Sequence, residues 1–116
     1  MNTTLECAGE QVGNTNSSQI AFSNDVFRRQ GFGVMVTRGI QDLGDEVIGV
    51  LRAVREFNAF TGDNDPYGEH DFGSFSWKDE KIFWKIDYYD EGLERWEDPL
   101  SSTCKRILTV MLAEEY

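Results

Sequence analysis

The chain has 116 residues, with 21 Asp and Glu against 11 Lys and Arg, which gives a formal net charge of −10. A chain of this length suits one domain, and its negative charge argues against direct binding to nucleic acid phosphates or an anionic membrane surface. No apolar run approaches the ~18 residues that a membrane span needs. The N-terminal region has neither the basic start nor the apolar core of a secretion signal, so we expect a cytoplasmic protein.

The first third of the chain predicts a tail, a helix and a strand. Residues 1–16 are polar and predict an N-terminal tail, which leaves residues 17–116 as a single domain. Ser17 or Ser18 is a suitable N-cap for a helix that runs to Gln30 and ends at Gly31. Residues 34–37 are mostly β-branched or apolar and predict a short strand.

The remainder predicts two helices that flank a hairpin. Apolar residues recur at helical spacing between Val47 and Phe57, which predicts a second helix. Residues 72–77 and 81–89 predict the two strands of a hairpin. A final helix is predicted from a second set of residues at helical spacing, Cys104, Ile107, Leu108, Met111 and Leu112.

This order of elements, α-β-α-β-β-α, predicts an α+β fold. The economical arrangement is a small sheet of about three strands, largely antiparallel, with the helices packed on one face.

The negative charge is concentrated in one part of the chain. Residues 61–100 hold 12 acidic and 4 basic residues, together with 9 of the 15 aromatic residues. Such a stretch is either a solvated surface that keeps the protein in solution or a carboxylate array that binds a basic groove on a partner protein.

The loop at residues 63–71 also suggests two kinds of chemistry. Its carboxylates could hold a hard cation, with Asp63, Asp65, Glu69 and Asp71 as the alternative metal ligands. The calcium-loop pattern fails, however, because Tyr67 and Ser74 stand where oxygen-rich ligands are needed. His70 with Asp71 could serve as a general base, although no recognisable nucleophile motif accompanies them. Turn formation around Pro66 and Gly68 explains much of the loop without either chemistry, and we expect no cofactor.

Three strings of residues carry a resemblance to a known family. They are residues 63–75 (DNDPYGEHDFGSF), 85–90 (KIDYYD) and 108–116 (LTVMLAEEY). Over residues 18–116 the chain resembles a bacterial family of small proteins that is catalogued only as a domain of unknown function. The family is found in proteobacterial genomes and on plasmids and integrated elements. The resemblance implies no activity and no catalytic residues. It implies a setting, because mobile elements often encode compact acidic proteins that block host restriction or CRISPR machinery.

We therefore expect a non-enzymatic inhibitor of mobile-element origin that binds the basic surface of a nucleic-acid-handling host defence protein. Such a protein would be of the anti-CRISPR or antirestriction type, would act by occlusion, and could do so as a DNA mimic. The alternatives are a metal-binding or hydrolytic enzyme centred on residues 63–71, and an accessory protein that scaffolds a partner. The expected partner-binding residues are acidic or aromatic: Asp63, Asp65, Tyr67, Glu69, Asp71, Asp90, Glu91, Glu94, Trp96 and Glu97.

Overall fold

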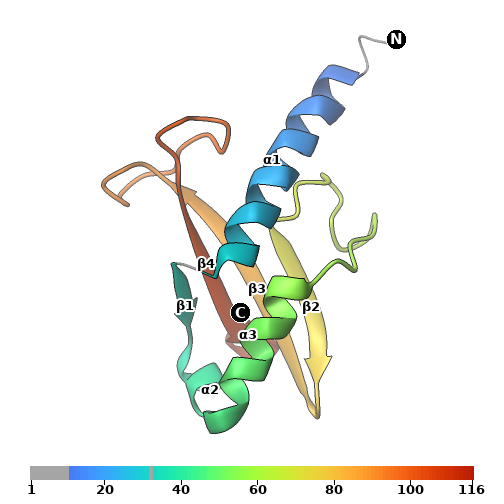
Figure 1. Cartoon of the computed structure of the whole chain (residues 1–116), viewed down its shortest axis with the longest axis vertical. Coiled ribbons are helices and arrows are strands. Elements are labelled where there is room, and N and C mark those ends of the chain that lie inside the picture. The colour runs from blue at the N-terminus through green and yellow to red at the C-terminus, as the bar shows by residue number, and fades with distance from the viewer. Residues whose placement is uncertain (1–10, 32) are drawn as a thin grey trace.

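The computed structural model describes residues 11–31 and 33–116, with side chains described from Asn16 onward (Figure 1). The helices are α1 (Gln11–Gln30), α2 (Arg38–Gln41) and α3 (Val47–Glu56), and the 3-10 turns are η1 (Gly44–Glu46) and η2 (Ala113–Glu115). The strands are β1 (Val34–Val36), β2 (Phe72–Trp77), β3 (Glu80–Tyr89) and β4 (Lys105–Leu112). None of the described helices is long and apolar enough to cross a membrane.

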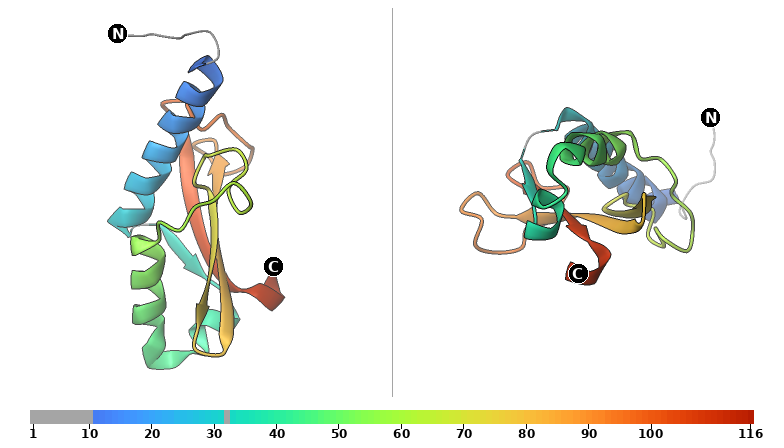
Figure 2. Two further views of the ribbon diagram at one scale, coloured as in Figure 1. Left: turned by 90° about the vertical axis from the view of Figure 1, so that its right-hand side faces the viewer. Right: turned by 90° about the horizontal axis from the view of Figure 1, so that it is seen from below.

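The strands form one four-stranded sheet in the order β1-β4-β3-β2. Strand β1 is parallel to β4, and the other two pairs are antiparallel. Helices α1 and α3 lie against the same face of this sheet, so the protein has two layers (Figure 2). The core lies between the layers and is centred on Trp84, which is fully buried on β3.

The predicted α+β class is confirmed, and the strands expected near residues 34–37, 72–77 and 81–89 are all present. The prediction of three strands, and of a helix at the C-terminal end, is wrong. Strand β4 occupies the position of the predicted helix, which makes the sheet four-stranded and mixed.

The error at β4 has a physical cause. Leu108, Val110 and Leu112 face the helices, while Met111 is buried on the opposite face of the sheet. A strand that is buried on both faces has a nearly continuous apolar sequence, and such a sequence also satisfies helical spacing.

The N-terminal boundary also differs from the prediction. Helix α1 begins at Gln11 instead of Ser17, so the predicted tail extends too far into the chain. Residues 1–10, which include Cys7, lie outside the described residues.

Two glycines bring the layers and strands close together. A Cβ atom at Gly49 of α3 would lie 2.6 Å from Cη2 of Trp77, so this glycine lets the helix pack directly on the Trp77 ring of β2. A Cβ atom at Gly73 of β2 would collide with the Trp84 indole. Gly73 therefore makes room for the central side chain of the core.

Candidate functional site

Two loops that are rich in acidic residues lie at the same end of the molecule. One loop connects α3 to β2 and the other connects β3 to β4, and both lie at the end of the sheet where β3 finishes (Figures 1 and 2). We call residues 61–71 and 87–98 the acidic end. They contain ten carboxylates and a single Lys or Arg residue, Arg95.

Five of the predicted partner-binding residues form the outer surface of the acidic end. Asp63, Glu91 and Glu94 are exposed carboxylates. Tyr67 is 79% exposed and Trp96 is 69% exposed, which is high for side chains with this much apolar area. Exposed acidic and aromatic side chains therefore occur on both loops of this end.

Other predicted residues serve the fold of the loops. Asp65 is buried and accepts a hydrogen bond from the backbone N–H of His70 at 3.2 Å, so it is not the surface residue that the sequence predicted. The Asp90 carboxylate accepts the backbone N–H of Glu94 at 3.0 Å and closes a turn. The Glu97 carboxylate accepts hydrogen bonds from the Ser101 and Thr103 hydroxyls.

His70 connects the acidic end to α1. Its Nδ1 lies 3.0 Å from Oδ2 of Asp25, and its Nε2 lies 3.6 Å from Oδ2 of Asp65. The imidazole ring is stacked on Phe60, with ring centroids 3.8 Å apart. His70 has φ 57°, a left-handed conformation in which histidine is found more often than most residues. Both ring nitrogens face carboxylates of the protein itself, and neither of these is Asp71, so the arrangement proposed for the hydrolytic alternative is not formed.

Arg28 makes the neighbouring contact between α1 and α3. It is fully buried, its Nε and Nη2 donate to the backbone oxygens of Val54 and Phe57 at 3.0 Å, and its Nη1 pairs with Asp25 at 3.0 Å. The guanidinium also lies 4.8 Å from the centre of the Trp84 ring. Burial lowers the pKa of Arg28, and the contact with Asp25 opposes that shift. We call Asp25, Arg28 and His70 the α1 junction.

Asn24 completes the attachment of α1 to the sheet. This fully buried residue donates from Nδ2 to the Tyr88 hydroxyl and to the backbone oxygen of Glu69, both at 2.9 Å. Its Oδ1 accepts from Nε of Arg106 at 2.6 Å. Sequence reasoning missed Asn24 and treated Arg28 only as a favourable charge near a helix end. The available signal was that Asn24 and Arg28 follow Ile20, which was expected to face inward, at spacings of four and eight residues.

A cavity lies at the edge of β3 within the acidic end. Strand β2 starts at Phe72, opposite Lys85, whereas β3 continues to Tyr89. Asp71 flanks this extension on one side, since its backbone oxygen accepts the N–H of Ile86 at 2.8 Å. Trp96 lies farther along the same edge and forms a β-bridge with Tyr89, whose opposite edge pairs with Lys105 of β4. The cavity between them measures about 310 Å³, and its other walls are Asp87 and Tyr88.

Asp71, which lines this cavity, and the nearby Glu69 are poorly compensated carboxylates. Burial raises the pKa of Asp71, and the negative charges of Asp65 and Asp87 raise it further. Burial likewise raises the pKa of Glu69, with added repulsion from Asp71 and Asp65. Among the described side chains, no Lys or Arg forms an ion pair with Asp71, whereas Asp87 pairs with Lys85 at 3.0 Å.

The metal alternative finds no matching arrangement. Nowhere in residues 16–31 and 33–116 do three His, Cys, Asp or Glu side chains gather as they would around a metal ion. Asp63 is exposed and Asp65 is turned to His70, so the four alternative ligands, Asp63, Asp65, Glu69 and Asp71, do not converge on one point.

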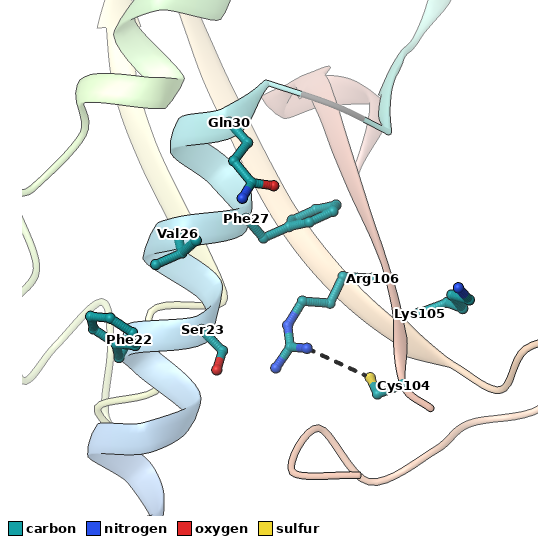
Figure 3. A pocket seen from close by; sticks show the side chains of 8 residues that line it. All are labelled: Phe22, Ser23, Val26, Phe27, Gln30, Cys104, Lys105 and Arg106. Carbon is teal, nitrogen blue, oxygen red and sulfur yellow. Dashed lines mark hydrogen bonds between the residues drawn. The ribbon is translucent and has the colours of Figure 1, made fainter. Parts of the chain in front are cut away.

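A second cavity, of about 400 Å³, has different chemistry (Figure 3). It lies between α1 and the start of β4, and no carboxylate lines it. Figure 3 shows Arg106 directed between Cys104 and α1, while Phe22 points away from Arg106. Arg106 donates hydrogen bonds to Asn24 of α1 and to the backbone oxygen of Pro99, so its guanidinium connects α1 to the β3–β4 loop.

The fold and the acidic end define a small two-layer α+β protein with a mixed sheet and one strongly negative end. Residues 36–115 match the model of the family described as "Protein of unknown function (DUF3768)", and the chain belongs to that family. The expected membership of a family of unknown function is therefore confirmed. No curated protein and no solved structure matches the chain. The matched segment contains the acidic end and the cavity, whereas α1 precedes it.

Proposed function

We propose that the protein is a non-enzymatic inhibitor that binds the basic surface of a nucleic-acid-handling protein and blocks it by occlusion. The setting implied by the family resemblance makes a host defence protein, of the restriction or CRISPR type, the proposed target. The observation that carries this proposal is the concentration of ten carboxylates at one end of the fold, where the only Lys or Arg is Arg95.

The distribution of charge supports a binding role over general solvation. Outside the acidic end, the whole remaining sequence holds eleven acidic and ten basic residues, so it is nearly neutral. A charge that served only to keep the protein in solution would not need to be concentrated at one end of the molecule.

The chemistry of the surface matches a groove built for phosphates. Clustered carboxylates attract a Lys- and Arg-rich surface and speed its association with the inhibitor, in a manner that salt weakens. Tyr67 and Trp96 are exposed among these carboxylates. Large aromatic side chains are frequent anchors at protein interfaces, since they bury much apolar area with few rotatable bonds.

Two variants of equal charge test the proposal. One neutralises exposed carboxylates of the acidic end, with Asp63→Asn, Glu91→Gln and Glu94→Gln. The control neutralises exposed carboxylates of the opposite end of the molecule, with Asp42→Asn, Asp79→Asn and Glu80→Gln.

Each protein is expressed in cells that carry one defined restriction or CRISPR system, and the entry of a targeted plasmid is measured by transformation. The wild type and the control variant are expected to raise plasmid entry against at least one system, and the acidic-end variant is expected to lose that effect. Equal loss in both variants, or no protection by the wild type against any system tested, contradicts the proposal.

A further inference from the structure

We propose that the cavity bounded by Asp71, Asp87, Tyr89 and Trp96 receives one arginine side chain of the partner protein. This inference rests on the proposed function, in which the acidic end binds a basic surface. It adds the position and the chemistry of one contact with that surface.

The cavity is already formed by the fold. Its floor is the edge of β3 beyond the start of β2, and its walls are held by the Asp71–Ile86 backbone hydrogen bond and the bridge between Tyr89 and Trp96. The turn that returns Trp96 to β3 is closed by the Asp90 backbone N–H, which donates to the Arg95 oxygen at 2.8 Å. A site whose walls need little ordering loses less entropy when a ligand enters.

The charges at the cavity select a cation. Asp71 is half-buried, has acidic neighbours, and pairs with none of the Lys or Arg residues that the structure describes. A positive group that entered beside it would relieve repulsion between carboxylates that water shields poorly. A neutral or anionic group would leave that repulsion unchanged or increase it.

The aromatic lining favours a guanidinium over an ammonium group. Three aromatic residues, Tyr88, Tyr89 and Trp96, line the cavity together with Asp71 and Asp87, and Asp87 already pairs with Lys85 at 3.0 Å. A guanidinium is planar, stacks on aromatic rings and donates two parallel hydrogen bonds to a carboxylate, whereas the ammonium of lysine is a compact and more strongly hydrated charge.

The core of the same protein contains this combination of groups. The Arg28 guanidinium lies over the Trp84 indole at 4.8 Å and pairs with Asp25 at 3.0 Å. Trp96 and Asp71 both line the cavity, and no arginine lines it. An arginine of a partner would complete the same kind of contact.

The test is an NMR titration of the whole protein with N-acetyl-arginine amide, with N-acetyl-lysine amide as the matched probe. Resonances of Asp71, Asp87, Tyr89 and Trp96 are expected to shift together with the arginine probe, and binding of the lysine probe is expected to be clearly weaker. Asp71→Asn and Trp96→Ala are each expected to weaken arginine binding by roughly tenfold, as the loss of a charge-assisted or stacked contact would. The control Asp79→Asn removes a charge from the turn between β2 and β3, away from the cavity wall, and is expected to bind the probe like the wild type.

Three outcomes overturn the inference: shifts spread over all carboxylates of the acidic end, equal binding of the two probes, or unchanged arginine binding in Asp71→Asn. These results are separable from failure of the proposed function. A wild type that protects plasmids although its cavity ignores arginine keeps the proposed function and loses this inference. If the cavity binds arginine but the protein protects no plasmid, the arginine site stands and the proposed function is lost.

Discussion

The α1 junction and the cavity adjoin each other in the sequence at His70 and Asp71, and their carboxylates differ in how they are compensated. At the junction, Arg28 and His70 both contact the Asp25 carboxylate, and the Arg28 guanidinium donates to backbone oxygens as well. One residue after His70, Asp71 faces the cavity without a Lys or Arg partner in the described part of the chain. A shielded charge that is compensated internally holds the fold together, whereas one left uncompensated at a cavity wall is available to a cation from outside.

The largest expected effect comes from breaking the junction at Arg28. Arg28→Met should lower the free energy of unfolding by about 3 kcal/mol, because it leaves Asp25 poorly compensated and removes the donors to Val54 and Phe57. Urea unfolding measures this change. The control Arg29→Met alters the exposed neighbour and should stay within about 0.5 kcal/mol of the wild type. Similar losses in the two variants would show that the buried guanidinium has no special role.

A smaller loss of stability is expected at His70. His70→Asn keeps a side chain that tolerates positive φ but loses the stacking on Phe60 and the contact with Asp25, so a decrease of about 1 kcal/mol is expected. Because His70 holds the fold in this account, the variant should still protect plasmids at a temperature where it is folded. Loss of protection by a folded His70→Asn protein would instead favour the hydrolytic alternative.

Neutralising Asp71 at the cavity is expected to raise the stability of the fold, whereas the changes at Arg28 and His70 lower it. Because the folded state raises the pKa of Asp71, the native protein holds more protons at this site than the unfolded chain between the ordinary carboxylate pKa and the raised one. The contribution of Asp71 to stability therefore falls as the pH rises through that window.

Asp71→Asn removes this penalty and should raise Tm slightly at neutral pH, with a gain that shrinks as the pH falls toward about 4. Thermal unfolding of both proteins over a pH series measures the difference. The exposed Asp63→Asn serves as the control and should show no such trend. A lower Tm for Asp71→Asn at neutral pH would mean that this carboxylate stabilises the fold.

The smallest effect on stability is expected at Trp96. Trp96→Ala should change the free energy of unfolding by no more than about 0.5 kcal/mol, because the side chain is 69% exposed. Protection of plasmids should nevertheless be strongly reduced. Ile48→Ala on α3 is a matched control, since Ile48 is also 69% exposed, and it should leave both properties unchanged. Equal protection by the two variants would remove Trp96 from the binding surface.

The sequence predicts the elements whose hydrophobic pattern has a single period. The alternation in β3 and the helical spacing from Val47 to Phe57 lead to the observed strand and helix. The prediction from hydrophobic pattern fails at β4, because burial on both faces removes the alternation that would have distinguished a strand from a helix.

For the site, composition predicts the acidic and aromatic surface but not the cavity. The cavity depends on where β2 stops along β3 and on the turn at Asp90 that returns Trp96 to Tyr89. Both are properties of strand register and turn geometry, which residue counts do not contain. The buried polar face of α1 was missed because Asn24 and Arg28 are residue types that normally lie on the surface.

The central claim, that the acidic end meets a basic partner surface, is tested most directly by zero-length cross-linking. A carbodiimide couples carboxylates to lysine amines only where they touch, and mass spectrometry of the complex recovered from cells identifies the joined residues. Links are expected from Asp63, Glu91 and Glu94 to partner lysines, and none from Asp42, Asp79 or Glu80 at the opposite end. Links concentrated at the opposite end, or spread evenly over both ends, would contradict it.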